Sequence, residues 1–80
     1  MYYVYRIQSL KHPLRHYTGY SADLRQRLQD HNAGKCDYTA PFCPWRLVFY
    51  AAFATKDKAR GFEDFLKSGS GIAFGKKRLW

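Results

Sequence analysis

An arginine and a histidine stand where the apolar stripe of a helix would be expected. The stripe at positions i, i+3, i+4 and i+7 consists of Leu24, Arg27, Leu28 and His31. A half-buried arginine needs an anion, because a charge that is removed from water without a partner is destabilising. The partner of Arg27 is then either an internal carboxylate such as Glu63 or a bound phosphate.

Two tyrosines could lie side by side on a sheet. Tyr5 belongs to segment 2–8 and Tyr17 to segment 16–20, and an antiparallel hairpin of these two strands would place both rings on one face. Gly19 weakens a strand interior unless backbone or ligand approaches closely, which indicates a working surface beside Tyr17. The alternative is that both tyrosines serve only cross-strand packing.

Glu63 borders the apolar side of a second expected helix, residues 56–67, for which Thr55 is the N-cap. Lys67 follows Glu63 at i+4, so one interpretation is a surface ion pair that contributes only about 0.3 to 0.5 kcal/mol. The other interpretation is metal binding, because Mg²⁺ prefers one or two carboxylates together with substrate oxygens. The Ser-Gly-Ser-Gly run at 68–71 is expected to break this helix.

Turn and capping signals predict the remaining elements. Ser21 as N-cap and Gly34 just past the end predict a first helix over residues 22–33. Residues 45–53 are mostly apolar, which predicts a third strand at the centre of the sheet. Residues 72–80 form either a short last helix or an irregular tail over the core.

Length, composition and charge indicate one basic globular domain, residues 1–80. Its 80 residues, of which 46% are hydrophobic, exclude a disordered chain, a repeat array and a large enzyme. A formal charge of +8 and a pI near 9.8 attract polyanions such as nucleic acid or anionic lipid. We recognise no signal peptide or membrane-spanning run and expect a cytoplasmic protein. Cys36 and Cys43 match no common zinc spacing and are expected to be reduced thiols.

These pieces follow one another in a characteristic order: Tyr3-Val4-Tyr5, Tyr17-Thr18-Gly19, Asp23-Leu24 with Arg27-Leu28 and His31-Asn32, Gly34-Lys35, and Glu63 with Leu66-Lys67-Ser68-Gly69. In this order and spacing they resemble the GIY-YIG nuclease superfamily over nearly the whole chain. Tyr-Val-Tyr stands for Gly-Ile-Tyr, and Tyr-Thr-Gly for Tyr-Ile-Gly. The chain is most similar to the small stand-alone GIY-YIG domain proteins of bacteria.

The resemblance implies an α+β fold with a small three-stranded antiparallel sheet flanked by helices. It implies a metal-dependent endonuclease that hydrolyses phosphodiester bonds in nucleic acid, with DNA favoured over RNA, in DNA repair or recombination. Glu63 would hold Mg²⁺ or Mn²⁺, Arg27 would bind charge on the phosphate, and His31 would assist proton transfer or orient a tyrosine. The catalytic residues that it implies are Tyr5, Tyr17, Arg27, His31 and Glu63.

Basic side chains around these motifs would contact phosphates without reading sequence. A chain of this length leaves no room for a separate recognition domain. We therefore expect low specificity, recognition of nucleic-acid shape, or a protein partner or homodimer that supplies the specificity. The basic residues expected at the nucleic acid are Lys35, Lys67, Lys76, Lys77 and Arg78.

Two other functions are compatible with the same fold. GIY-YIG proteins often carry an asparagine near the C-terminus, whereas Asn32 is the only one here, which favours a catalytically weak or inactive nucleic-acid-binding module. An interaction subunit of a larger protein is favoured by aromatic residues that look exposed in the sequence. These residues are Tyr2, Tyr20, Tyr38 and Trp80.

Overall fold

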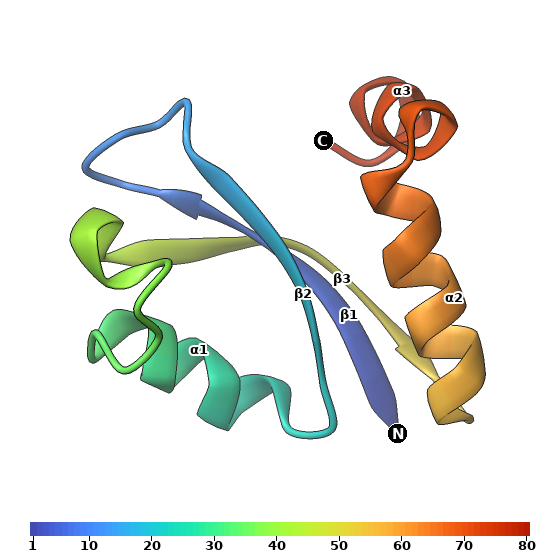
Figure 1. Cartoon of the computed structure of the whole chain (residues 1–80), viewed down its shortest axis with the longest axis horizontal. Helices are drawn as coiled ribbons and strands as arrows, with labels where there is room; N and C mark the ends of the chain where they lie inside the picture. Colours follow the sequence, from blue (N-terminus) through green and yellow to red (C-terminus); the bar gives the residue numbers. More distant parts are fainter.

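A three-stranded antiparallel sheet lies between helices (Figure 1). The computed structural model describes all residues, 1–80. The strand order is β2-β1-β3, with α1 on one face and α2 and α3 on the other, which confirms the predicted α+β class. The elements are β1 (Tyr2–Ser9), β2 (His16–Ser21), α1 (Leu24–Asn32), a turn of 3-10 helix (Ala40–Phe42), β3 (Trp45–Phe53), α2 (Lys56–Lys67) and α3 (Gly69–Arg78).

The central strand β1 sends alternate side chains to opposite faces of the sheet, as its sequence predicts. Val4 packs with Ala59 and Leu66 on the face that α2 covers. Tyr5 and Ile7 are buried on the opposite face, where leucines of α1 cover them. Two small cores therefore lie on the two faces of one sheet.

The third strand lies at an edge, so its predicted place at the centre of the sheet is wrong. Phe49 and Phe53 of β3 lie against the ring of Phe62 in α2. Leu47 packs on the other face, in the core beneath α1. The sequence of β3 is apolar because elements cover both of its faces, and not because strands pair with it on both sides.

Asp23 caps α1 in place of the predicted Ser21, and the helix begins at Leu24 and not at residue 22. The carboxylate of Asp23 accepts a hydrogen bond from the N–H of Gln26, at 3.1 Å. The hydroxyl of Ser21 bonds to the backbone of Asp23 instead. Gly34, with a φ of 74°, follows the helix as predicted.

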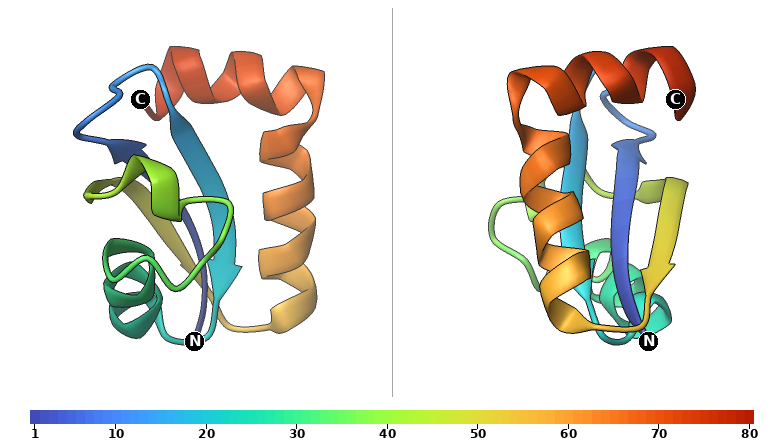
Figure 2. Two further views of the ribbon diagram at one scale, coloured as in Figure 1. Left: turned by 60° about the vertical axis from the view of Figure 1, so that its left-hand side comes forward. Right: turned by 90° about the vertical axis from the view of Figure 1, so that its right-hand side faces the viewer.

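The second helix has its predicted bounds, and the hydroxyl of Thr55 accepts the N–H of Lys58 at its start. Ser68 ends α2 and also caps α3, where it accepts the N–H of Gly71. The serine–glycine run thus ends one helix and starts the next, and α3 lies across one end of the sheet (Figure 2). No helix of the chain is both long and apolar enough to cross a membrane.

Candidate active site

A chain of buried hydrogen bonds starts at Tyr5 in β1 and ends in the loop after α1. The hydroxyl oxygen of Tyr5 lies 2.7 Å from Nε2 of His31, and Nδ1 of His31 lies 2.7 Å from Oγ1 of Thr39. Solvent reaches 1% of Tyr5 and none of His31 or Thr39. A strand, a helix and a loop each supply one of these three residues. This series of hydrogen bonds therefore forms only in the folded protein.

The hydrogen-bond partners favour the tautomer of His31 that carries its proton on Nδ1. The hydroxyl of Thr39 donates to the carbonyl of Cys36, at 3.4 Å, and therefore accepts from Nδ1–H of His31. Nε2 of His31 is then free to accept the proton of the Tyr5 hydroxyl. Burial lowers the pKa of His31, and the charge of Arg27 adds to this effect, so the imidazole is neutral.

Arg27 reaches the same tyrosine from one turn earlier in α1. Its Nε lies 3.4 Å from the hydroxyl oxygen of Tyr5, and this hydrogen bond raises the pKa of Arg27. Of the two partners considered for Arg27, the internal carboxylate Glu63 is excluded, because Glu63 pairs with Lys67 at 3.1 Å. Arg27 takes part in neither ion pair of the protein, which leaves its guanidinium available to an anion.

Gly19 leaves room for the phenol of Tyr5. The two residues are partners across the hairpin, and a Cβ atom at Gly19 would lie 2.5 Å from the Tyr5 hydroxyl oxygen. The ring of Tyr17 lies 6.3 Å from that of Tyr5 on the same face, which confirms the predicted placement of the two tyrosines. Tyr17 also lies against His31, with 5.2 Å between ring centroids. The structure thus brings Tyr5, Tyr17, Arg27 and His31 together.

Glu63 lies on α2, across the sheet from this group. Phe62 precedes it and faces β3, where it contacts Phe49. Helical geometry therefore turns Glu63 toward the β2 side of α2, because neighbouring residues of a helix point about 100° apart. The Glu63 side chain is 16% exposed, and its carboxylate bonds to Lys67. No hydrogen bond joins Glu63 to the tyrosines.

An open hollow of about 490 Å³ crosses the edge strand β2 and connects the two sides. Tyr17 lines it next to the Tyr5 group, and Lys67 lines it next to Glu63. Tyr17 is the one expected catalytic residue that lines the hollow, and its other wall includes Lys67, the ion-pair partner of Glu63. It is lined by Arg6, His16, Tyr17, Thr18, Tyr38, Leu66, Lys67 and Ile72.

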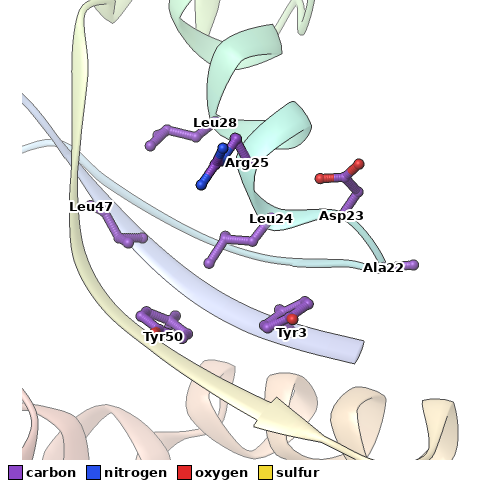
Figure 3. Close-up of a pocket in the computed structure, with 8 residues that line it drawn as sticks. All are labelled: Tyr3, Ala22, Asp23, Leu24, Arg25, Leu28, Leu47 and Tyr50. Atoms are coloured by element: carbon purple, nitrogen blue, oxygen red, sulfur yellow. The ribbon is translucent and has the colours of Figure 1, made fainter. Parts of the chain in front are cut away.

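A second hollow of similar volume, about 490 Å³, lies between α1 and β3 (Figure 3). Tyr3, Leu24 and Leu47 give it a mostly apolar wall, and Arg25 lies on its α1 side. It contains none of the catalytic residues expected from the sequence. The hollow over β2 is therefore the candidate active site.

Thr39, which bonds to His31, and Arg6, which lines the hollow, were not predicted as site residues from the sequence. Thr39 lies in a loop, where no periodicity marks a residue as inward-facing. The alternation along β1 could have identified Arg6. It shares the α2 face of β1 with Tyr2 and Val4, where a further apolar residue is expected.

The basic residues expected at the nucleic acid all have exposed side chains. Lys67 borders the hollow, and residues 76–78 form the last turn of α3. Lys35 follows α1 and lies 3.9 Å from Asp30. The structure thus places one of these cations at the hollow and distributes the others around it.

The expected surface of exposed aromatic side chains is mostly wrong. Tyr38 is 69% exposed and lies against Tyr17. Tyr2, Tyr20 and Trp80 are partly buried against the core beneath α2. Helices cover both faces of this sheet. The exposure of an aromatic side chain therefore depends on which element packs over it, and its position in the sequence does not give this.

Comparison with known proteins decides the family to which this arrangement belongs. Residues 1–74 match the GIY-YIG catalytic domain, a span that includes every residue of the Tyr5 group and Glu63. The protein belongs to the GIY-YIG family. A GIY-YIG domain is a nuclease-type domain and implies interaction with nucleic acid in general.

Streptococcal relatives of this GIY-YIG protein carry the name UPF0213 protein, which specifies no activity. One from Streptococcus pyogenes serotype M3 is 39% identical over 66 residues, which cover 81% of this chain and 70% of the relative. One from Streptococcus pneumoniae serotype 4 is 42% identical over 53 residues, or 65% of this chain and 54% of the relative. The family therefore establishes the type of domain.

Proposed function

We propose that this GIY-YIG protein is a metal-dependent endonuclease that hydrolyses phosphodiester bonds in nucleic acid, with DNA as the favoured substrate. The observation that carries the proposal is the buried chain from Thr39 through His31 to Tyr5, beside an arginine without a carboxylate partner. A tyrosine that served only core packing would not need these partners. Here Nε2 of His31 and the guanidinium of Arg27 both contact the hydroxyl oxygen of Tyr5.

Tyr5 acts in this proposal as the general base for the attacking water. Burial raises the pKa of Tyr5 to about 12, so its phenolate is scarce at neutral pH. A concerted relay avoids a free phenolate, because the Tyr5 proton moves to Nε2 of His31 while the Tyr5 oxygen takes a proton from water, and the proton returns from His31 through Tyr5 to solvent after cleavage. The water oxygen bonds to phosphorus, the bond to the 3′ oxygen breaks, and solvent protonates the leaving oxygen. Tyr17 and Arg27, which are partly exposed, line the approach to Tyr5.

Arg27 would hold the phosphate over Tyr5. Its Nε already points at the Tyr5 hydroxyl, and its other nitrogens make no ion pair within the protein. A guanidinium in this position stabilises the negative charge that develops on the non-bridging oxygens in the transition state.

Glu63 is the residue that would hold the divalent metal. Its side chain is 16% exposed, and Oε2 is bonded only to Lys67. A single carboxylate fits Mg²⁺ or Mn²⁺, because these ions take much of their coordination shell from water and phosphate oxygens. Lys67 does not block this, since a helical ion pair contributes only about 0.3 to 0.5 kcal/mol. A metal held there would shield the phosphate charge and stabilise the leaving oxygen.

The setting that we propose is DNA repair or recombination in the cytoplasm. The formal charge of +8 supports a polyanionic substrate, and phosphate contacts by surface lysines and arginines carry little sequence information. Specificity would then come from the shape of the nucleic acid, or from a protein partner or a second copy of the chain.

Cleavage of labelled duplex, flap, branched and single-stranded DNA and RNA, with Mg²⁺, Mn²⁺ or EDTA, tests the proposed nuclease. We expect metal-dependent product whose rate falls at least about a hundredfold in Arg27→Ala and in Glu63→Ala. Arg25→Ala and Asp64→Ala are matched controls, because each removes the same charge at an exposed neighbour on the same helix. Undiminished cutting in Glu63→Ala or Arg27→Ala would show that the site is elsewhere.

The second candidate function is a nucleic-acid-binding module with weak or no catalysis. One observation favours it: the only asparagine, Asn32, bonds to the backbone N–H and C=O of Trp45 and so anchors the start of β3. Both polar atoms of the Asn32 side chain are thus occupied by structural hydrogen bonds. Binding that needs no metal, with no product from any substrate, would favour this module over the nuclease.

A further inference from the structure

Arg6 lines the hollow and, like Arg27, has no anionic partner. Its Nε is buried without a hydrogen-bond partner, and its Nη1 lies 3.5 Å from Oγ1 of Thr18, at the outer limit of a hydrogen bond. Neither ion pair of the protein includes it. Burial lowers the pKa of Arg6, which expresses the same unfavourable desolvation of its charge. An anion that binds here would offset that cost.

Trp80 holds the Arg6 guanidinium in place. The guanidinium carbon lies 4.1 Å from the centroid of the Trp80 ring. Trp80 is itself fixed, because its backbone N–H donates to the carbonyl of Gly75 in α3 and its ring lies against Phe49. An arginine that is already oriented loses little conformational freedom when it binds a ligand.

The hollow gives Arg6 a direct connection to the catalytic group. Arg6 and Lys67 line its α2 side, and Tyr17, next to Tyr5, lines it across β2. A volume of about 490 Å³ is of the size that accommodates a nucleotide-sized ligand. A strand that lies over β2 with one phosphate at Arg27 would therefore bring a neighbouring phosphate toward Arg6 and Lys67.

We propose that Arg6 binds a backbone phosphate next to the one that is cleaved, with Lys67 as the accompanying cation. The inference rests on the proposed function, which supplies nucleic acid as the ligand and places the phosphate that is cleaved at Arg27. The alternative is that Arg6 serves the fold alone, through its contact with Trp80.

Binding of a fluorescein-labelled DNA duplex in EDTA, measured by anisotropy over a series of salt concentrations, tests this site without cleavage. We expect Arg6→Gln to weaken binding about tenfold and to reduce the slope of log K against log[salt] by about one phosphate contact, roughly 0.9. Arg6→Lys keeps the charge and should keep the slope, with part of the affinity, because an ammonium lacks the fork of the guanidinium.

Arg60→Gln is the matched control for this experiment. Arg60 also lies over an aromatic ring, that of Tyr20 at 5.6 Å, but it does not line the hollow. Its substitution removes the same charge and should leave the slope unchanged. Equal effects of Arg6→Gln and Arg60→Gln would mean that only net charge matters and would overturn the proposal.

A measurement on the wild-type protein covers the case in which Arg6→Gln does not fold. The Nε–H of Arg6 is buried, so its side-chain NMR signal should be protected from exchange and visible. We expect this signal to shift on titration with the same duplex, and a signal that stays in place while DNA binds overturns the phosphate site. If the protein cleaves DNA but the Arg6 signal does not shift, the phosphate site at Arg6 is refuted and the nuclease proposal stands. If the signal shifts but no substrate is cleaved, the nuclease proposal is refuted and phosphate binding at Arg6 stands.

Discussion

At the scale of the residue, the site depends on side chains that orient one another. His31 is useful as a base only if Nε2 is the unprotonated nitrogen, and the hydroxyl of Thr39 determines this from the far side of the ring. Thr39 is thus a positioning residue, since it touches His31 and not the substrate. Its role can be separated from packing because valine has nearly the same shape without the hydroxyl.

Thr39→Val should lower kcat about tenfold or more, because Nδ1–H of His31 loses its acceptor and the imidazole is no longer held in the required tautomer. The free energy of unfolding should fall by about 1–3 kcal/mol, the typical cost of an unpaired buried polar group. Thr39→Ser keeps the hydroxyl and should recover most of the rate. A rate that is equally low in both variants would contradict this role, and cleavage kinetics with a thermal melt make the comparison.

Gly19→Ala should damage the site directly. The added methyl group would lie 2.5 Å from the Tyr5 hydroxyl oxygen and 2.9 Å from the Tyr17 ring, so one of these rings must move. We expect a loss of about 1–3 kcal/mol in the free energy of unfolding. We also expect a fall in kcat of about tenfold or more, because the phenol leaves its position beside His31. Near-wild-type melting and cleavage would mean that the Tyr5 position is not critical.

At the scale of the element, α2 and α3 form a bent pair whose corner is closely packed. A Cβ atom at Gly71 would lie 1.6 Å from the backbone carbonyl oxygen of Phe65, so the corner tolerates only glycine without a backbone shift. Gly61 differs, because no atom lies within 4 Å of the position that a methyl group would take. Gly61 and Gly71 therefore respond in opposite ways to the same substitution.

Gly61→Ala should raise the free energy of unfolding by about 0.5–1 kcal/mol, since alanine has the higher helix propensity at a position without steric conflict. Gly71→Ala should lower it by about 1–3 kcal/mol, because the crossing of α2 and α3 has to open. Urea denaturation of the two variants beside wild type measures both values. A stabilising Gly71→Ala would show that the corner is less tightly packed than described.

At the scale of the whole molecule, stability should depend on pH through its buried histidine. The folded-state pKa of His31 is lowered, first by burial and then by Arg27, from an ordinary value of about 6.5. Below about pH 6.5 the unfolded chain therefore binds a proton that the folded chain does not. The contribution of His31 to stability is complete above about pH 6.5 and is lost as the pH falls toward its folded-state pKa.

We expect thermal melts of wild type to show a lower midpoint at pH 5.5 than at pH 7.5. The His31→Gln variant should lose much of this difference, whatever its stability at pH 7.5. The pKa of His16 is also lowered by partial burial, but His16 lies at the surface, so His16→Gln is the control. An unchanged pH dependence in His31→Gln would contradict the assignment of a neutral buried imidazole.

The sequence by itself determined the features that arise from local periodicity. The alternation along β1, the stripe of Arg27 and His31 on α1, and the bounds and cap of α2 all follow from neighbours a few residues apart. The order of the GIY-YIG motif residues is likewise a property of the linear chain, and it pointed to the family that the comparison establishes. Such features need no knowledge of which elements meet in space.

Only the tertiary structure decided which groups meet. That β1 and not β3 is central depends on strand pairing, and both strands have apolar sequences. That Thr39 meets His31, and that Arg27 meets the hydroxyl of Tyr5, depends on how α1 and the loop after it dock on one face of the sheet. These contacts join elements through packing of the whole chain, and no local pattern encodes them.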